Sequence, residues 1–286
     1  MLDVTELLVT QVIERLRASY REMFGERELE YLSLATESAR VVLSRIAQSD
    51  ALYHNVEHTV HVTLVGLEIL GGRLLRHPHD VAPRNWINVV VSLLCHDVGY
   101  VRGICAADGV DRIASGIGSQ TLWIASGTSD AALMPFHVDR GKRFVGEHFG
   151  TAAALVDLDV VQACIERTRF PVPADPWYQQ TGDDPGLVRG ADLIGQLSDP
   201  RYLSKLAAVF FEFEEVGFNQ TTGYRRPGDL LYSYPTFFES NVVPYIGDAE
   251  FFLRQTAGGR DVIASLYRNL DAARRPRTVL AAANNA

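Results

Sequence analysis

The sequence predicts an all-α fold, a compact multi-helix body, and three observations support that prediction. Apolar residues recur at every third or fourth position through most of the chain, as they do on one face of a helix. Strand-like alternation of apolar and polar residues is almost absent. The composition, 47% hydrophobic and 22% charged, is that of a packed globular protein.

The first four elements are expected to be helices because of their apolar spacing. The second helix follows a break at residues 24–27, and the third is ended by His77-Pro78. The fourth is so apolar that we expect it to be buried. The predicted helices cover residues 7–16, 29–46, 55–75 and 85–95.

Residues 103–135 differ from the rest of the chain because Gly, Ala, Ser and Asp dominate there. A long loop or lid is predicted, since a loop of this length in a compact domain is usually functional or mobile. The Gly- and Pro-containing segment 219–234 is also predicted to be a loop. The remaining helices are expected at residues 140–149, 152–167, 187–197, 202–216, 237–245 and 261–275.

Charge and cysteine content exclude several classes of function. The chain has 27 Lys plus Arg against 35 Asp plus Glu, a formal net charge of -8, so nucleic acid is not expected as a partner. Three cysteines without C-x-x-C spacing indicate neither a disulfide framework nor a thiolate zinc site, and they favour a cytoplasmic location. We expect no membrane partner, because the N-terminus is unlike a signal peptide and the most apolar stretch, residues 86–95, is too short to span a bilayer.

Histidines and aspartates stand at three separate places that suit one site. His54 and His58 are four residues apart, which places them on one face of a helix. The apolar fourth helix ends in His96-Asp97, and Asp192 lies in an otherwise apolar helical segment. Burying such groups without partners costs several kcal/mol, so each needs a partner or a metal ion.

Two imidazoles and two carboxylates suit a borderline or hard divalent ion, and the lack of thiolates argues against a structural zinc site. The expected cofactor is one or two ions of Mn, Mg, Fe, Co or Zn, which would acidify a bound water. The alternative is that the histidines satisfy backbone groups and that Asp192 pairs with Arg189. That alternative leaves the order of the residues unexplained.

The order His58, His96-Asp97, Asp192 resembles the H…HD…D signature of HD-superfamily phosphohydrolases, which are helical proteins. Residues 53–58, Tyr-His-Asn-Val-Glu-His, are similar to the Y-H-N-x-x-H motif of class I cyclic nucleotide phosphodiesterases. The segment 191–200 is similar to the one that carries their last metal ligand. The resemblance spans roughly residues 50 to 215.

This resemblance implies a role for each residue of the motif. His54 would be the general acid that protonates the leaving oxygen, and Asp97 would bridge to a second ion. The ligands of the first metal would be His58, His96, Asp97 and Asp192. The chain departs from the phosphodiesterases where Tyr100 replaces a histidine of the second metal's water shell and where His61 replaces an aspartate.

Four more residues are candidates for a second metal site or for substrate contact, namely His137, Arg140, Tyr100 and His61. His137 follows the 103–135 segment, and Arg140 belongs to a basic run with Lys142 and Arg143 that suits an anionic phosphoester. His61 shares a helical face with His58, so it could bind the metal. The alternative is that it has a structural role or orients a metal ligand. For the basic run the alternative is a solvated helix face.

We therefore expect a single domain over residues 1–286, with N-terminal helices in 1–50, a metal-binding core in 51–215, and a C-terminal loop and helices in 216–286. The expected activity is metal-dependent hydrolysis of a small phosphate mono- or diester, such as a nucleotide or cyclic nucleotide, by a monomer or homo-oligomer. Two alternatives are a non-catalytic ligand-binding module and an HD-type diiron oxygenase. The oxygenase would use His58, His96, Asp97, His137, His148 and Asp192.

Overall fold

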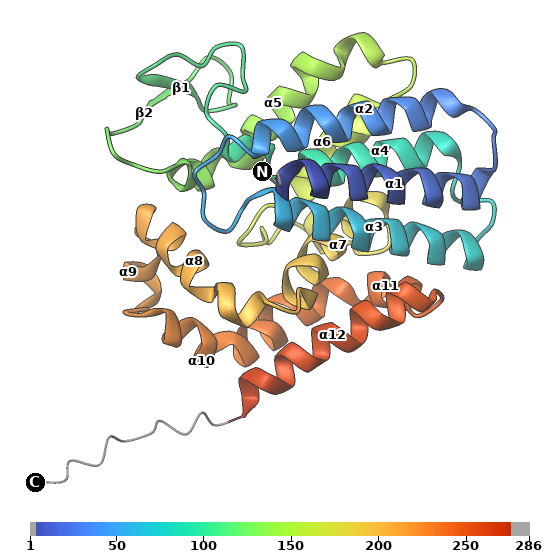
Figure 1. Cartoon of the computed structure of the whole chain (residues 1–286). Coiled ribbons are helices and arrows are strands. Elements are labelled where there is room, and N and C mark those ends of the chain that lie inside the picture. Colours follow the sequence, from blue (N-terminus) through green and yellow to red (C-terminus); the bar gives the residue numbers. More distant parts are fainter. Residues whose placement is uncertain (1–3, 276–286) are drawn as a thin grey trace, which may run out of the picture.

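Helices make up most of the described part of the chain, which confirms the all-α prediction (Figure 1). The computed structural model describes residues 4–275. Two 3-10 segments, Val98–Tyr100 and Asp130–Phe136, lie before and after a short β-hairpin. The α-helices are α1 (Val4–Phe24), α2 (Leu29–Ile46), α3 (Val56–Arg76), α4 (Pro83–Cys95), α5 (His137–Phe149), α6 (Leu158–Arg167), α7 (Asp184–Ser198), α8 (Tyr202–Glu215), α9 (Phe218–Thr222), α10 (Pro227–Phe237), α11 (Val243–Leu253) and α12 (Ala257–Arg274).

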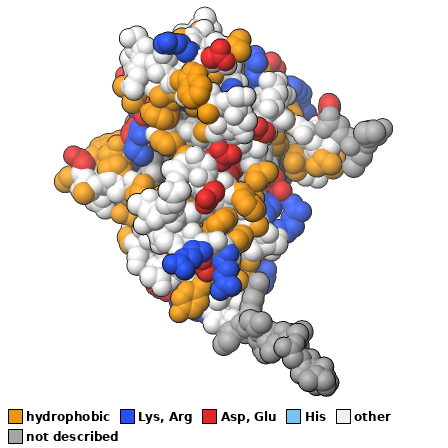
Figure 2. All heavy atoms as spheres, turned by 90° about the vertical axis from the view of Figure 1, so that its left-hand side faces the viewer, with side chains coloured by type: hydrophobic (Ala, Val, Ile, Leu, Met, Phe, Trp, Pro, Cys, Tyr) orange, Lys and Arg blue, Asp and Glu red, His pale blue; other side chains and the backbone are white. Residues whose placement is uncertain are grey.

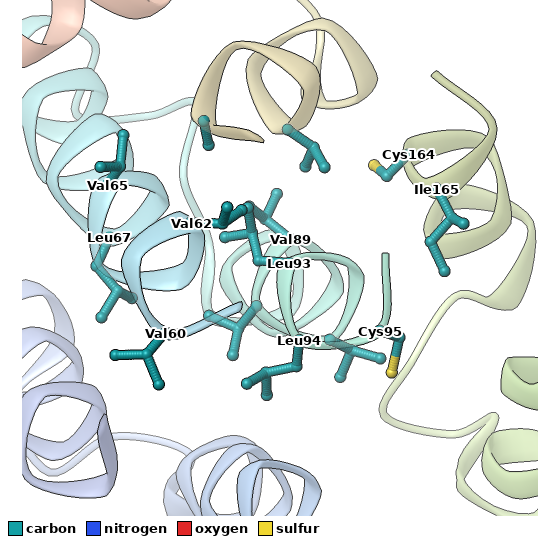
Figure 3. Close-up of a cluster of buried hydrophobic side chains, with 14 of the residues drawn as sticks. Val60, Val62, Val65, Leu67, Val89, Leu93, Leu94, Cys95, Cys164 and Ile165 are labelled. Carbon is teal, nitrogen blue, oxygen red and sulfur yellow. The ribbon is translucent and has the colours of Figure 1, made fainter. Parts of the chain in front are cut away.

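Helix α4 lies in the middle of the core, where α2, α3, α6 and α7 pack around it. Every residue from Trp86 to Cys95 is buried, which explains why this segment has no polar face. Figure 3 shows Leu93 of α4 beside Val62 of α3, with Cys164 of α6 on the far side. Because burying each aliphatic side chain stabilises the fold by about 1.5–3 kcal/mol, the C-terminal end of α4 is held firmly in place.

Helices α3 and α7 approach closely because Gly195 has no side chain. A Cβ atom at this position would lie 2.8 Å from the backbone Cα of Val62, closer than packed atoms come. One turn before Val62 is His58, and one turn before Gly195 is Asp192. The close contact of the two helices therefore brings an imidazole and a carboxylate from distant parts of the chain together.

A second glycine brings the end of α4 against the start of α5. A Cβ atom at Gly99 would lie 1.8 Å from the backbone oxygen of His137, so only glycine fits there. Gly99 comes two residues after Asp97. The contact therefore places the first residue of α5 beside the His96-Asp97 turn.

The segment 103–135 is not a plain loop. It contains a short antiparallel hairpin of β1 (Arg112–Ala114) and β2 (Thr121–Trp123), in which Ile113 pairs with Leu122. The hairpin projects from one end of the molecule in Figure 1. Arg140 of α5 anchors its base, because its guanidinium bonds to the Asp108 carboxylate and to the backbone oxygen of Ala114.

The prediction of a loop over residues 219–234 is wrong, because most of this segment is helical in α9 and α10. Pro227 occupies the first turn of α10, where a missing N–H leaves no hydrogen bond unmade, so proline starts this helix and does not break it. The helix expected over residues 152–167 begins later, at Leu158, where the Asp157 side chain accepts a hydrogen bond from Val160 N.

None of the described helices combines the length and the apolar character that crossing a membrane requires. Figure 2 views the side of the molecule that carries the hairpin and α8–α10. On that face, basic, acidic and apolar side chains are interspersed, and no extended basic patch is visible.

Candidate metal centre

His58 is positioned by the start of α3. Asn55 caps this helix, because its side-chain oxygen accepts hydrogen bonds from the backbone N–H groups of Glu57 and His58 at 3.0 and 3.3 Å. The asparagine of the Tyr-His-Asn segment thus begins the helix that carries the second histidine. The His58 side chain is buried, only 3% exposed, and faces α4 and α7.

Three elements bring the four expected ligands together. His96 and Asp97 follow α4 directly, His58 comes from α3, and Asp192 lies in the middle of α7. The donor atoms of His58, His96 and Asp192 all lie within 4.8 Å of one another, the spacing of a group that could hold one metal ion. Asp97 joins them, since its Oδ2 lies 3.1 Å from His58 Nε2 and 3.2 Å from His96 Nε2.

The spacing of these atoms fits a single ion. The two Nε2 atoms are 3.3 Å apart, and each lies 3.5 Å from Asp192 Oδ1. Donors bound at about 2.1 Å from one ion are about 3.0 Å apart in octahedral and 3.4 Å apart in tetrahedral geometry. The measured separations of 3.1 to 3.5 Å are therefore those of neighbouring ligands.

Buried polar atoms at the cluster lack hydrogen-bond partners. Asp97 Oδ2 is at ion-pair distance from both imidazoles but makes no hydrogen bond of ordinary geometry, and His58 Nδ1 has no partner either. An unsatisfied buried carboxylate oxygen is costly, so it calls for a cation. His96 is oriented by its other nitrogen, because Nδ1–H donates to the backbone oxygen of Leu93 at 2.8 Å and leaves the Nε2 lone pair facing the cluster.

The charges of the cluster depend on one another. Burial alone would lower the pKa of His96, but the Asp97 and Asp192 carboxylates outweigh burial and hold it well above its usual value. Burial would raise the pKa of Asp97, but the imidazoles, His96 first, hold it well below its usual range. Burial would also raise the pKa of Asp192, but the nearby His58 and His96 imidazoles outweigh burial and lower it to about 2. Two anionic carboxylates beside two basic nitrogens form a donor set that suits a divalent cation.

His137 lies on the opposite side of the Asp97 carboxylate. Its Nε2 is 3.8 Å from Asp97 Oδ1, whereas His58 and His96 approach Oδ2. The His137 Nδ1–H donates to the backbone oxygen of Met134, so the Nε2 lone pair is free. Asp97 and His137 together could hold a second ion.

A residue that the sequence reasoning missed completes the site. Glu212 of α8 is 1% exposed, and its Oε2 accepts a hydrogen bond from His54 Nδ1 at 2.5 Å. Its Oε1 accepts from the backbone N–H groups of Tyr53 and His54. The only signal in the sequence is an acid between phenylalanines in an apolar helix, the kind of signal that indicated Asp192.

Tyr100 stacks on both nearby histidines. Its ring is 4.5 Å from the His54 ring and 4.6 Å from the His137 ring, with interplanar angles of 9° and 23°. Burial, with smaller effects from Asp97 and Glu212, raises the pKa of Tyr100 well above its usual value. The phenol therefore stays neutral and lines the site between the two imidazoles.

His61 does not face the metal cluster. It belongs to a second group with Glu57 and Asp199, whose carboxylates lie 3.9 Å from its Nε2. The ammonium group of Lys205 already neutralises these acids, because it lies 3.0 Å from Glu57 and 2.5 Å from Asp199. This group is an ion-pair network joining α3 to α8.

The basic residues at the start of α5 form ion pairs with acidic side chains outside the metal cluster. Arg140 is fully buried and bonds to Asp108 and to the backbone oxygens of Gly99 and Val101, so it makes no contact with the cavity. Arg143 pairs with Glu147, and Lys142 pairs with acidic groups of α5 and α6. Arg189 bonds to backbone oxygens of the 178–180 turn and forms no ion pair with Asp192.

A cavity of about 390 Å³ opens beside the cluster, and His54, Asp97, Tyr100, His137 and Asp192 line one part of it. A larger groove of about 650 Å³ lies between α1 and α2, but it contains none of the histidines. The smaller cavity is therefore the one that connects to the candidate metal centre.

The fold and this site define an all-α protein with a buried His and Asp cluster that could hold a divalent metal ion. The chain matches the Npun_R2479-like family over residues 2–275, and it belongs to that family. Searches of curated proteins and of solved structures found no significant match.

Proposed function

We propose that this protein is a metal-dependent phosphohydrolase of the HD superfamily that hydrolyses a phosphate mono- or diester. The observation that carries the proposal is the meeting of His58, His96, Asp97 and Asp192 next to a histidine held by a buried carboxylate. A metal cluster alone would suit many functions. An imidazole beside it, oriented by a buried carboxylate, supplies the proton donor that breaking a phosphoester bond requires.

The metal ligands and His54 would have different roles in the hydrolysis. A divalent ion in the cluster would supply Lewis acidity toward a phosphoryl oxygen and would lower the pKa of a bound water. Asp97 and Asp192 retain that cation by their negative charge. His54 donates Nδ1–H to Glu212, so its Nε2 is the nitrogen left to protonate the leaving oxygen.

The first test is the metal content and the hydrolytic activity of matched variants. Asp97→Ala should lose both bound metal and turnover on a panel of phosphate mono- and diesters with Mn²⁺, Mg²⁺, Co²⁺, Fe²⁺ and Zn²⁺. His54→Asn should keep its metal and slow turnover by about two to four decades. His148→Ala is the matched control, because His148 contacts Phe144 and should change neither quantity. A metal-loaded wild-type protein that is silent across the whole panel would contradict the proposal.

A diiron oxygenase is the second candidate, and the position of His137 beside the Asp97 carboxylate favours it. Its full set of six ligands also needs His148. Both histidines lie on α5 eleven residues apart, about 16 Å along the helix, so His148 does not reach the cluster. Iron analysis with an oxygen electrode separates the candidates, because the oxygenase should contain two irons and consume oxygen.

A further inference from the structure

The cavity beside the metal-centre residues is apolar over most of its wall. Away from Asp97 and Asp192 it extends between α8, α9, α10 and the 168–172 segment. The side chains there are mainly aliphatic and aromatic, among them Leu206, Val209, Phe213, Phe218, Leu230 and Phe237. A ligand that reaches the metal centre must place the rest of its structure against this surface.

Two arginines line the cavity in the described part of the chain, and other groups already engage both. Arg169 forms ion pairs with Glu166 and Asp139. Arg189 donates to backbone oxygens of the 178–180 turn. A polyphosphate needs several free cationic donors in addition to the metal ion. Among the arginines of this wall only the Arg189 Nε lacks a partner, too few free donors for a polyphosphate, so a substrate with one phosphate group fits better.

Four neutral polar groups of the wall bond in pairs, whereas the buried Tyr234 hydroxyl has no hydrogen-bond partner. Gln196 Nε2 donates to the Tyr202 hydroxyl at 3.2 Å, and the hydroxyls of Ser233 and Tyr224 are 3.0 Å apart. A nucleobase packed against the hydrocarbon part of this wall would leave polar ring and amino groups without partners, which costs free energy. An alkyl or aryl group has no polar atoms to satisfy and gains by leaving water.

We infer that the substrate carries a single phosphate group esterified to an apolar alkyl or aryl alcohol, which fills the space beneath α8, α9 and α10. This inference rests on the proposed phosphohydrolase function. The volume of about 390 Å³ corresponds to about a dozen non-hydrogen atoms at roughly the volume of one liquid water each. A phosphate with a short to medium hydrocarbon group matches that volume.

The reaction balances as a hydrolysis without any redox step. The oxygen of water forms a new bond to phosphorus, and the bond between phosphorus and the ester oxygen breaks. His54 gives a proton to the departing oxygen, which leaves as the neutral apolar alcohol. The attacking water releases its proton to solvent, so the products are inorganic phosphate and the alcohol.

The first experiment varies only the length of the apolar group. The metal-loaded full chain is assayed with ethyl, butyl, hexyl and octyl phosphate, whose leaving alcohols have similar acidity, and with AMP and ATP. From ethyl to octyl phosphate kcat/KM should rise at least about 100-fold, because each buried methylene contributes about threefold to fourfold. Equal rates along the series, or faster hydrolysis of AMP or ATP than of octyl phosphate, would overturn the inference.

A binding measurement separates failure of this inference from failure of the proposed function. Calorimetry with ethylphosphonate and octylphosphonate, which cannot be hydrolysed, reports the contact with the wall whether or not turnover occurs. If octylphosphonate bound more tightly but no phosphoester were hydrolysed, the cavity would still be assigned an apolar ligand, and the proposed phosphohydrolase function would be wrong. If both phosphonates bound with equal affinity, the inference of an apolar substrate group would be wrong, whether or not the protein hydrolyses phosphoesters.

Two neighbouring phenylalanines of α8 provide a matched pair of variants. Phe213 lines the cavity, whereas Phe211 is 54% exposed and does not. Phe213→Ser should weaken octylphosphonate binding about tenfold and leave ethylphosphonate binding unchanged. Phe211→Ser should change neither. If Phe213→Ser weakened the binding of both phosphonates equally, the apolar wall would not be the surface that contacts the alkyl group.

Folding of the Phe213 variant is checked by its thermal transition. Phe218→Ser is the second cavity variant, because its ring packs 4.6 Å from that of Phe213 and also lines the cavity. If neither variant folds, the dependence of wild-type affinity on chain length decides the matter alone.

Discussion

Glu212 shows how one buried side chain can determine the role of another. Its carboxylate accepts the Nδ1–H of His54 and also two backbone N–H groups, so the carboxylate cannot turn away from the imidazole. Burial alone would lower the pKa of His54, but Glu212 outweighs burial and raises the pKa to about 9, with smaller contributions from Asp97 and Asp192. Without a bound metal ion the imidazole is therefore charged at neutral pH, and its hydrogen bond to Glu212 fixes its direction.

Replacing Glu212→Gln should slow hydrolysis of alkyl phosphates by about 10- to 100-fold while the metal content stays at the wild-type level. Glutamine keeps the size of the side chain and can still accept the hydrogen bond, but it removes the charge that stabilises the imidazolium.

The acidity of the leaving group distinguishes this role from a structural one. Turnover of p-nitrophenyl phosphate should change by less than about threefold, because a good leaving group needs little protonation. A uniform loss of activity on both kinds of substrate would mean that Glu212 only supports the fold.

The sequence indicated the four candidate metal ligands but not Glu212, and the difference has a physical reason. His58, His96, Asp97 and Asp192 stand in a recognisable order, and burial of their segments implied that they needed partners. Glu212 is 158 residues from His54, and nothing in its spacing relates the two. A contact made through tertiary packing between side chains so far apart leaves no periodicity to detect.

Among the elements, the contact of α3 with α7 controls whether the cluster can form. Gly195→Ala should lower both the melting temperature and the metal affinity. The new Cβ would lie 2.8 Å from the Val62 backbone, so the two helices must move apart and Asp192 must move away from His58. Thermal melting and a metal titration measure the two effects.

Gly247→Ala on α11 is the control for that substitution. An added Cβ at Gly247 meets nothing within 4 Å, and alanine favours helix over glycine, so stability should stay equal or rise slightly. If Gly195→Ala behaved like this control, the packing of α7 against α3 would not be what positions the carboxylate.

Elements with strong periodicity were predicted well, and elements that depend on turns were not. The apolar spacing located α2, α3 and α4 closely, whereas the prediction of 7–16 covers only about half of α1 (Val4–Phe24). The segment 219–234 was interpreted as a loop because proline and glycine break helices in their interior, yet Pro227 stands at a helix start, where it is favoured. The hairpin at β1 and β2 has only three residues in each strand, too few to produce a detectable alternation.

For the whole molecule, one hydrophobic cluster extends from Val12 in α1 to Leu270 in α12. The metal-centre residues lie against it and come from α3, α7 and the turn after α4. In the absence of a cation, the Asp97 carboxylate and two imidazoles are buried together at that junction, next to the partly buried carboxylate of Asp192. The stability of the whole chain should therefore depend on the bound ion.

Removing the metal with a chelator should lower the melting temperature of the wild-type protein. A ligand present at one hundred times its dissociation constant stabilises the native state by about 2.7 kcal/mol. For a chain of this size that corresponds to roughly 5 °C. His58→Ala is the control, because a variant that binds no ion should melt at the same temperature with and without chelator. If the wild-type melting temperature stayed constant while metal analysis showed that the ion had left, the ion would not be what holds α3, α4 and α7 together.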